Sequence, residues 1–327
     1  MSWTEYYIPP DVQLWQGRSD APPLSYFFQV MQCIDLTKNK KIHCANTTIV
    51  FGLIGFCCDE GIRRNLGRIG AAEGPLAIRN SLAKLPVPQR AFACFDVGNI
   101  VCVNGNLEGA QQALANVVAL LLEKNITPIV LGGGHELAWG HYQGITKTFP
   151  QKQLGIINFD AHFDMRPIAP DNRGNSGTPF LQMALATQVD SRRFDYNCVG
   201  IQSMGNITFL FKTAEEYQVK ILLADDIQQG KTEKNMQFFD RVFSQNDMVY
   251  LSLCLDVFAA AYAPGVSAPQ ALGIPPWLLM PWFQYVATSG KVISYDVAEL
   301  SPKYDIDAHT ARLAASFVYQ IIYHHTK

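Results

Sequence analysis

The chain has 327 residues, of which 48% are hydrophobic and 17% charged, and its formal net charge is -2. This composition allows a large buried core and provides no basic face, which argues against nucleic-acid binding. No apolar run approaches the roughly 18 residues that a membrane span needs, and the start MSWTEYYIPP lacks the basic and apolar regions of a signal peptide.

The positions of the cysteines indicate their redox state. All eight lie outside CxxC pairs, and most fall within apolar strand-like runs. This pattern indicates reduced thiols and not a disulfide framework or a zinc ribbon. We therefore expect a cytoplasmic protein with neither a membrane nor a nucleic acid as partner.

Apolar runs typical of strands alternate along the chain with segments typical of helices. This alternation predicts a mainly parallel sheet of about eight strands with helices on both faces, a three-layer α/β/α fold. Strands are expected at residues 47–57, 91–97, 127–133, 154–160, 197–202, 220–225, 248–257 and 291–297. Helices are expected at residues 73–84, 107–123, 208–218, 234–244, 276–288 and 307–323. We expect one domain over residues 41–327, with residues 1–40 as an extension packed on it or lying near the mouth of its site.

The first candidate site residue, His135, follows the apolar run at residues 127–130. The stretch LGGGHELAWGHY ends that strand in glycines, after which a helical pattern begins. His135 is therefore predicted to lie at the edge of the sheet. The alternative is a structural role, which is the usual one for a lone histidine after glycines.

The most informative cluster is Asp160, His162 and Asp164, in INFDAHFDMRP. The apolar run before it, Leu154 to Phe159, is typical of a buried parallel strand. Residues at i, i+2 and i+4 of an extended strand share one face, so the three side chains are expected to converge at the strand's carboxyl end. The alternative is that a carboxylate caps the next helix and that His162 is a core histidine.

A third apolar strand carries Cys254 and Asp256 near its carboxyl end. A cysteine in such a strand is usually an inert small hydrophobic residue. However, three strands that all end in metal-ligand residue types predict a site for divalent ions such as manganese, and six ligands suffice for two ions that share bridging groups.

The motifs GGGHE, DAHFD and SLCLD resemble the three metal motifs of the ureohydrolase superfamily of arginases, agmatinases and formimidoylglutamases, whose patterns are GG(D/G)H, DAHxD and SxDxD. Further stretches are similar to the formimidoylglutamase branch: WQGRSD, DEGIRRNLGRIGAAEGP, GGGHELAWGHY, DAHFDMRP, SGTPF and APGVSAP. The resemblance extends from about residue 15 to residue 325.

The resemblance implies two Mn2+ ions. The implied ligands are His135, Asp160 and Asp164 for the first ion and Asp160, His162 and Asp256 for the second. Asp160 would bridge the ions, and Cys254 occupies the second bridging position, where the family has an aspartate. A thiolate bridge shifts preference toward zinc, iron or cobalt, and a mononuclear or metal-free site is left open as the alternative.

Three further residues are assigned to the substrate. Arg166 stands two positions after DAHFD and can fork onto a carboxylate, with a surface or structural ion pair as the alternative. Ser176 lies in the following loop, in the neighbourhood where arginases keep a histidine that shuttles protons. Glu299, in SYDVAELSP, resembles the acidic residue that holds the guanidinium or amidinium group, with helix capping as the alternative. Weaker candidates are Arg64, Arg68 and Arg173 for carboxylates and Asp296 for support of the ligands.

The resemblance implies hydrolysis of N-formimidoyl-L-glutamate to L-glutamate and formamide in histidine degradation. Water activated at the metal site would attack the formimidoyl carbon, Glu299 would stabilise the intermediate, and Asp164 would protonate the glutamate nitrogen. Two alternatives stay open: an agmatinase-like or guanidinobutyrase-like amidinohydrolase, and a metal-poor inactive paralogue that binds ligand. The expected partner is a small-molecule substrate, and homo-oligomer formation is also open.

Overall fold

The computed structural model describes residues 2–38 and 49–326 and has an α/β fold built on one large sheet. Within these residues the sheet has ten strands. They are β1 (Tyr7–Ile8), β2 (Gln32–Cys33), β3 (Ile49–Cys57), β4 (Phe92–Val101), β5 (Thr127–Leu131), β6 (Leu154–Phe159), β7 (Asp195–Ile201), β8 (Lys220–Leu223), β9 (Met248–Cys254) and β10 (Val292–Ala298).

The strand order is β1-β4-β3-β5-β10-β9-β6-β7-β8, and β2 also pairs with β4. Every pairing is parallel except that of β1 with β4. The central strand β6, with the sequence LGIINF, is buried along its whole length, as expected for a parallel strand covered on both faces. The mainly parallel sheet predicted from the sequence is therefore confirmed.

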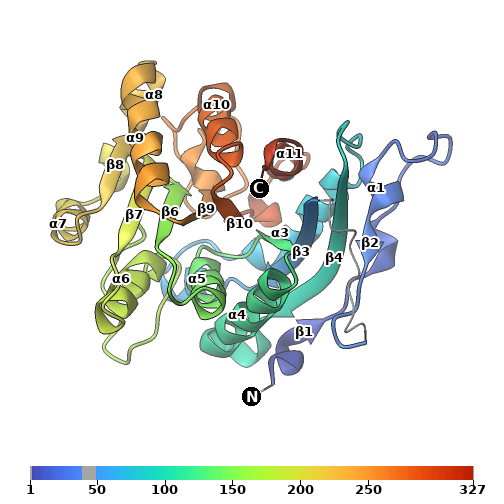
Figure 1. The fold of residues 1–327 in the computed structure, drawn as a ribbon, viewed down its shortest axis with the longest axis horizontal. Helices are drawn as coiled ribbons and strands as arrows, with labels where there is room; N and C mark the ends of the chain where they lie inside the picture. Colours follow the sequence, from blue (N-terminus) through green and yellow to red (C-terminus); the bar gives the residue numbers. More distant parts are fainter. Residues whose placement is uncertain (1, 39–48, 327) are drawn as a thin grey trace.

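Helices cover both faces of the sheet (Figure 1). One apolar core joins the sheet to α3, α8, α9, α10 and α11, and a second core joins its other face to α4, α5, α6 and α7. The helices are α1 (Phe27–Val30), α2 (Glu60–Arg64), α3 (Gly74–Leu82), α4 (Leu107–Glu123), α5 (Leu137–Thr148), α6 (Pro179–Val189), α7 (Thr208–Glu216), α8 (Ala224–Gln228), α9 (Thr232–Gln245), α10 (Pro276–Ala287) and α11 (His309–His324).

Local chemistry explains where the elements begin and end. For example, α4 starts at the predicted residue because Asn106 caps it, with its Oδ1 accepting from the N–H of Gly109 at 3.0 Å. In contrast, β4 runs four residues past its predicted end at residue 97, because its carboxyl-terminal half pairs with β1 through Asn99 and Ile100. Residues 47 and 48 of the first expected strand, together with Cys44, lie outside the described residues.

The N-terminal residues extend the sheet beyond the eight strands expected, since β1 and β2 both lie on the edge strand β4. The indole N–H of Trp15 donates to Asp96 of β4 at 2.9 Å, and Arg79 of α3 forms a buried ion pair with the same carboxylate at 2.8 Å. Buried polar groups that are paired in this way hold the N-terminal segment along β4.

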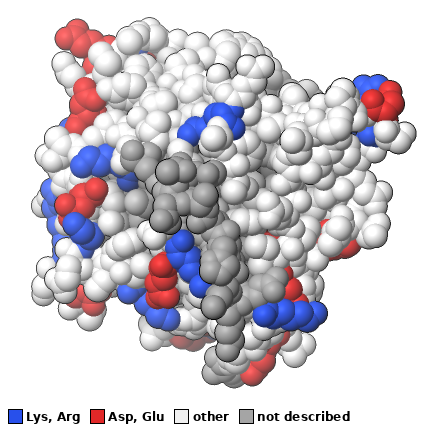
Figure 2. Space-filling view, turned by 45° about the vertical axis from the view of Figure 1, so that its right-hand side comes forward, with Lys and Arg blue, Asp and Glu red and all other residues white. Residues whose placement is uncertain are grey.

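The distribution of charged side chains on the surface agrees with the composition. On the face drawn in Figure 2, acidic and basic side chains are interspersed, with no extended basic area. None of the helices within residues 2–38 and 49–326 combines the length and the apolar character that a membrane crossing requires.

Candidate metal centre

The candidate ligands and Glu299 come from the carboxyl ends of four strands that are neighbours in the sheet. In the order β5-β10-β9-β6, these ends lead to His135, to Glu299, to Cys254 with Asp256, and to the segment 160–164. The carboxyl ends of parallel strands meet at one edge of the sheet, so residues far apart in sequence are brought together there.

His135 reaches this edge through a tight glycine turn. Gly133 has a φ of +77°, and a Cβ on this residue would lie only 2.5 Å from the carbonyl oxygen of Phe56. Both the positive φ and the closeness of this oxygen exclude a side chain at position 133, which explains the glycine there. The helix α5 then begins at Leu137, two residues after His135.

The cluster Asp160, His162 and Asp164 converges in a different way from the one predicted. We expected an extended strand to place the three side chains on one face, but β6 ends at Phe159 and the segment that follows is not a strand. Asp164 has a φ of +48°, so the chain turns in the left-handed region to bring its carboxylate back toward His135.

Asp160 lies between the two histidines. Its Oδ2 is 3.0 Å from Nδ1 of His135, and its Oδ1 is 3.6 Å from Nδ1 of His162. The Oδ2 of Asp164 is also 3.0 Å from Nδ1 of His135, and the Oδ2 of Asp256 is 3.1 Å from Nδ1 of His162. Each oxygen of Asp160 thus faces a different histidine, which is the arrangement that a bridging carboxylate requires.

Among residues 2–38 and 49–326, two sets of ligand atoms are compact enough to hold an ion, with every atom of a set within 4.8 Å of the others. One set is His135, Asp160 and Cys254, and the other is Asp160, His162 and Asp256. Asp160 belongs to both sets. Asp164 is in neither set, although its carboxylate approaches His135 as closely as that of Asp160.

Two buried polar atoms at this centre lack a hydrogen-bond partner, namely Nδ1 of His135 and Oδ1 of Asp256. Buried polar atoms in folded proteins are nearly always paired, because an unpaired one loses its hydration without compensation. Lone pairs aimed into a cluster of nitrogen, oxygen and sulfur atoms are what a divalent cation would satisfy. The residues present therefore fit a metal site.

The tautomer of His135 follows from its neighbours. Ser252 donates its hydroxyl hydrogen to Asp296 at 2.6 Å, so its oxygen accepts from Nε2 of His135 at 2.9 Å. Nε2 therefore carries a proton, which leaves Nδ1 as the atom that would bind a metal. Asp296 is anchored in turn by the ring of His141 at 2.7 Å and by the Tyr250 hydroxyl. The sequence suggested Asp296 as a supporting residue. Ser252 and His141 lie in the stretches SLCLD and GGGHELAWGHY but received no role there, and Tyr250 lies in neither stretch.

Cys254 is buried at the end of β9, with 1% of its surface exposed. Burial, followed by the charges of Asp160 and Asp256, raises the pKa of its thiol well above the ordinary value. The same thiol hydrogen-bonds to Asp256 and lowers the pKa of that carboxyl, although burial and Asp160 raise that pKa overall. The sulfur thus contacts both sets of ligands, and a bound cation would favour its thiolate form.

Strong pKa shifts distinguish the acids of this centre. Burial and the charge of Asp160 raise the pKa of Asp164 to about 6. Burial would also raise the pKa of Asp160, but the neighbouring imidazoles of His135 and His162 outweigh burial and lower it. Burial, then the charges of Glu136 and Asp256, raises the pKa of Glu299 well above its usual range.

Glu299 is held at the centre by backbone contacts. Its Oε1 accepts the N–H of His135 at 2.8 Å, and its own N–H donates to the carbonyl of Gly133 at 2.9 Å. Like Asp164, it has a positive φ, here +73°. Non-glycine residues in this region are strained and concentrate at functional sites.

A cavity of about 110 Å³ opens over the centre. It is lined by residues expected from the sequence, namely His162, Asp164, Arg166, Ser176, Asp256 and Glu299, together with Asn65, Gly205, Asn206, Leu210, Ser267 and Ala268. Among these additional residues, Asn65 donates to the Ser176 hydroxyl at 3.1 Å.

Arg166 differs from the other arginines near the cavity. It is exposed, and its guanidinium forms no salt bridge with any carboxylate of the described residues. Arg64 pairs with Glu60 and Glu108, and Arg173 pairs with Asp171. Arg68 donates to the backbone oxygens of residues 266 and 267 and stacks on a tyrosine ring. Arg64, Arg68 and Arg173 therefore already have partners within the protein, whereas the guanidinium of Arg166 lines the cavity without one in the part of the chain that the structure describes.

Comparisons with known proteins are consistent with this geometry. The arginase family profile matches residues 50–323. The formimidoylglutamases of Legionella pneumophila (strain Paris) and Clostridium tetani are 45% and 41% identical to this chain, each over 97% of it and over 97% and 95% of their own length. The crystal structure of Trypanosoma cruzi formiminoglutamase with Mn2+ superposes with a TM-score of 0.76 at 25% identity, covering 84% of this chain and 92% of that one.

Proposed function

The chain belongs to the arginase family, and from this membership we propose that it hydrolyses N-formimidoyl-L-glutamate to L-glutamate and formamide in histidine degradation. It is accordingly a hydrolase that acts on the C–N bond of a linear amidine. The support comes from relatives named formimidoylglutamase that match nearly the whole chain and from the chemistry of the cavity.

One observation carries the choice of substrate: candidate metal ligands, Glu299 and the unpaired Arg166 line a single cavity. N-formimidoyl-L-glutamate combines a cationic amidine with two carboxylates, so it needs an acidic and a basic partner together. Agmatine carries two cationic ends and no carboxylate. It would leave Arg166 unpaired and be repelled by it.

We propose two Mn2+ ions as the cofactor, as in the T. cruzi formiminoglutamase solved with Mn2+. His135, Asp160 and Asp164 would hold one ion, Asp160, His162 and Asp256 would hold the other, and Cys254 would add a thiolate ligand. The unpartnered atoms of His135 and Asp256 support this assignment. When bound, divalent ions lower the pKa of a water molecule and make it a nucleophile near neutral pH.

The protein's own groups orient the substrate and move the proton. Arg166 and Ser176 hold the glutamate portion, and Glu299 pairs with the amidinium. A partner of that charge relieves the cost of a carboxylate buried without a counterion. Asp164 takes a proton from the attacking water and delivers it to the departing glutamate nitrogen.

A substrate panel tests the proposal. Purified protein loaded with Mn2+ is incubated with N-formimidoyl-L-glutamate, L-arginine, agmatine and 4-guanidinobutyrate, and formamide and urea are measured. We expect formamide release to exceed every other reaction by about 100-fold or more, because each of the others lacks a required charge or presents a repelled one. Preferred turnover of agmatine or 4-guanidinobutyrate would refute the substrate assignment. A protein that takes up little metal and turns over none of the four compounds would be the metal-poor inactive paralogue.

We also propose the cytoplasm as the compartment, since every cysteine within the described residues is free. Residues 1–40 are proposed to form an extension on a catalytic domain of residues 41–327, which the pairing of β1 and β2 with β4 supports. The partner is a small-molecule substrate. A homo-oligomer is a further proposal, and light scattering of the purified protein tests it.

A further inference from the structure

Asn65 lies on the wall of the cavity beside Arg166 and Ser176, although no sequence motif assigned it a role. It caps the carboxyl end of α2, where its N–H donates to the carbonyl of Gly61 at 2.9 Å. Its side-chain amide donates to the Ser176 hydroxyl at 3.1 Å. The residue thus connects α2 with the loop that carries Ser176.

The side chains of Asn65 and Arg166 both lie next to Gly177. A Cβ built on Gly177 would lie 2.8 Å from Cδ of Arg166 and 3.0 Å from Nδ2 of Asn65. The backbone N–H of Arg166 also donates to the carbonyl of Gly177 at 2.7 Å. The absence of a side chain at this position therefore allows an amide and a guanidinium to face the same small volume.

The hydrogen bond between Asn65 and Ser176 leaves donors available. Nδ2 of Asn65 carries a second hydrogen, and the hydroxyl of Ser176 uses its oxygen to accept and keeps its own hydrogen free to donate. A carboxylate accepts about four hydrogen bonds, of which a forked guanidinium supplies two. Arg166, Asn65 and Ser176 together match that demand.

The acidic groups and the hydrogen-bond donors of the cavity lie at opposite ends of it. Its acids, Asp164, Asp256 and Glu299, lie with the metal centre, whereas the donors Asn65, Arg166 and Ser176 gather around Gly177. A carboxylate would be repelled at the first end and paired at the second.

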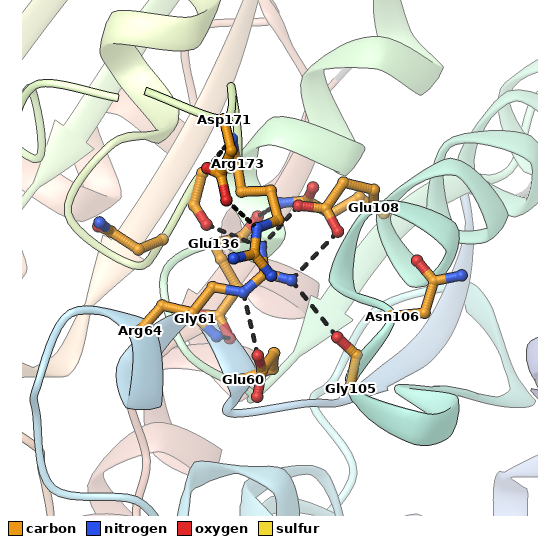
Figure 3. Close-up of polar contacts among 12 residues, drawn as sticks. Glu60, Gly61, Arg64, Gly105, Asn106, Glu108, Glu136, Asp171 and Arg173 are labelled. Atoms are coloured by element: carbon orange, nitrogen blue, oxygen red, sulfur yellow. Dashed lines mark hydrogen bonds and ion pairs between the residues drawn. The ribbon is translucent and has the colours of Figure 1, made fainter. Parts of the chain in front are cut away.

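Arg64, the residue before Asn65, forms a network of polar contacts with neighbouring elements (Figure 3). The Arg64 guanidinium lies 3.0 Å from Glu60 of α2 and 2.6 Å from Glu108 at the start of α4. It also donates to the carbonyl of Gly174 at 3.1 Å, two residues before Ser176. The Arg64 side chain is 12% exposed and that of Glu108 is 48% exposed. The contacts of Arg64 connect α2 with α4 and with the loop that carries Ser176.

We propose that Asn65 is a specificity-determining residue whose side-chain amide donates to the substrate carboxylate that Arg166 binds. The inference rests on the proposed function, because it takes the substrate to be an amidine that bears carboxylates. It adds to that function an uncharged donor that completes the recognition of one carboxylate.

The test compares Asn65→Ala and Asn65→Asp with wild type, all loaded with Mn2+, on three substrates. These are N-formimidoyl-L-glutamate, N-formimidoyl-4-aminobutyrate, which lacks the α-carboxylate, and N-formimidoyl-L-norvaline, which lacks the side-chain carboxylate. Asn116→Asp on α4 is the matched control, because Asn116 bonds to Gln112 and Lys147 and does not line the cavity.

We expect Asn65→Ala to raise KM for N-formimidoyl-L-glutamate about 10-fold and Asn65→Asp about 100-fold, with kcat changed less than about threefold. For the analogue that lacks the contacted carboxylate, the KM values of wild type and Asn65→Ala should agree within about twofold. An equal rise on all three substrates would mean that Asn65 only supports the loop and would overturn the proposal. So would an unchanged KM in Asn65→Asp.

Binding of the product L-glutamate, measured by calorimetry on the same metal-loaded proteins, separates this inference from the proposed function. L-Glutamate carries both carboxylates, so Asn65→Asp should weaken its binding about 10-fold or more whether or not turnover occurs. If wild type binds L-glutamate in an Asn65-dependent way but hydrolyses nothing, the proposed function fails and the role of Asn65 stands. If wild type hydrolyses the substrate and Asn65→Asp binds L-glutamate as tightly as wild type, the role of Asn65 fails alone.

Discussion

The metal end of the cavity is built on strand ends, whereas the end around Arg166 is built from α2 and a loop. Asp160 and Cys254 are buried, and they sit directly at the ends of β6 and β9. Arg166 is exposed, and Asn65 is only partly buried. The first end is positioned by the core of the sheet, while the second depends on side-chain bonds such as those of Arg64.

This difference separates two kinds of function. Groups that carry out the reaction need fixed geometry, which buried strand ends supply. Groups that choose the substrate can lie on loops, whose sequence varies at little cost to the core. Substitutions at the metal end should therefore change metal content and kcat, and substitutions at the loop end should change KM.

Asp160→Ala should give the largest effect. It removes the carboxylate whose two oxygens face both histidines, so we expect loss of both ions and a fall in turnover well beyond the 10- to 100-fold typical of supporting residues. Asp256→Ala, as the comparison, should weaken mainly the second ion. Metal per chain measured by mass spectrometry decides the matter, and full occupancy in Asp160→Ala would refute the bridging assignment.

Arg166→Leu should act at the opposite end of the cavity. We expect KM for N-formimidoyl-L-glutamate to rise on the order of 10- to 1000-fold, the effect of one lost charge-assisted pair and of the carboxylate left unpaired. Metal content should stay at the wild-type level. Unchanged Michaelis kinetics would assign Arg166 to the protein surface and remove the division between the two ends.

Substitutions of Cys254 test whether the metal end of the cavity tolerates a change of ligand. If its thiolate bridges the ions, Cys254→Ala should lower metal affinity by about 10- to 100-fold, and Cys254→Asp should raise manganese affinity and keep or increase activity. If Cys254 is only a buried apolar thiol, Cys254→Ala would be nearly silent and Cys254→Asp would destabilise the fold through an unpaired buried charge. Metal titration and thermal unfolding of the three proteins distinguish these outcomes.

Arg64→Met should give the smallest effect. It removes the contacts that hold α2 against the loop but leaves every group that faces the substrate, so we expect a rise in KM of about 3- to 10-fold with metal content unchanged. Arg63→Met is the matched control, because Arg63 is mostly exposed and pairs only with Glu60 among the described residues. Equal effects of the two substitutions would argue against a positioning role for Arg64.

Part of the site could be predicted from sequence because strand ends are local features. The apolar runs before His135, Asp160 and Cys254 mark buried parallel strands, and the carboxyl ends of such strands share an edge. The expected geometry of the DAHFD segment was nevertheless wrong. The segment turns at Asp164 because tertiary contacts hold its backbone at a positive φ, which no periodicity of two could indicate.

The sequence by itself determined the alternation of strands and helices, the residues at the strand ends, and therefore the chemistry of the metal centre. Only the tertiary structure decided which groups face that centre from elsewhere. Asn65 meets Ser176 across 111 residues, and Arg64 meets Gly174 across 110. Strand and helix patterns arise from interactions between near neighbours in the chain, whereas these contacts exist only once α2 and the loop pack together, and a single sequence carries no local signal of that packing.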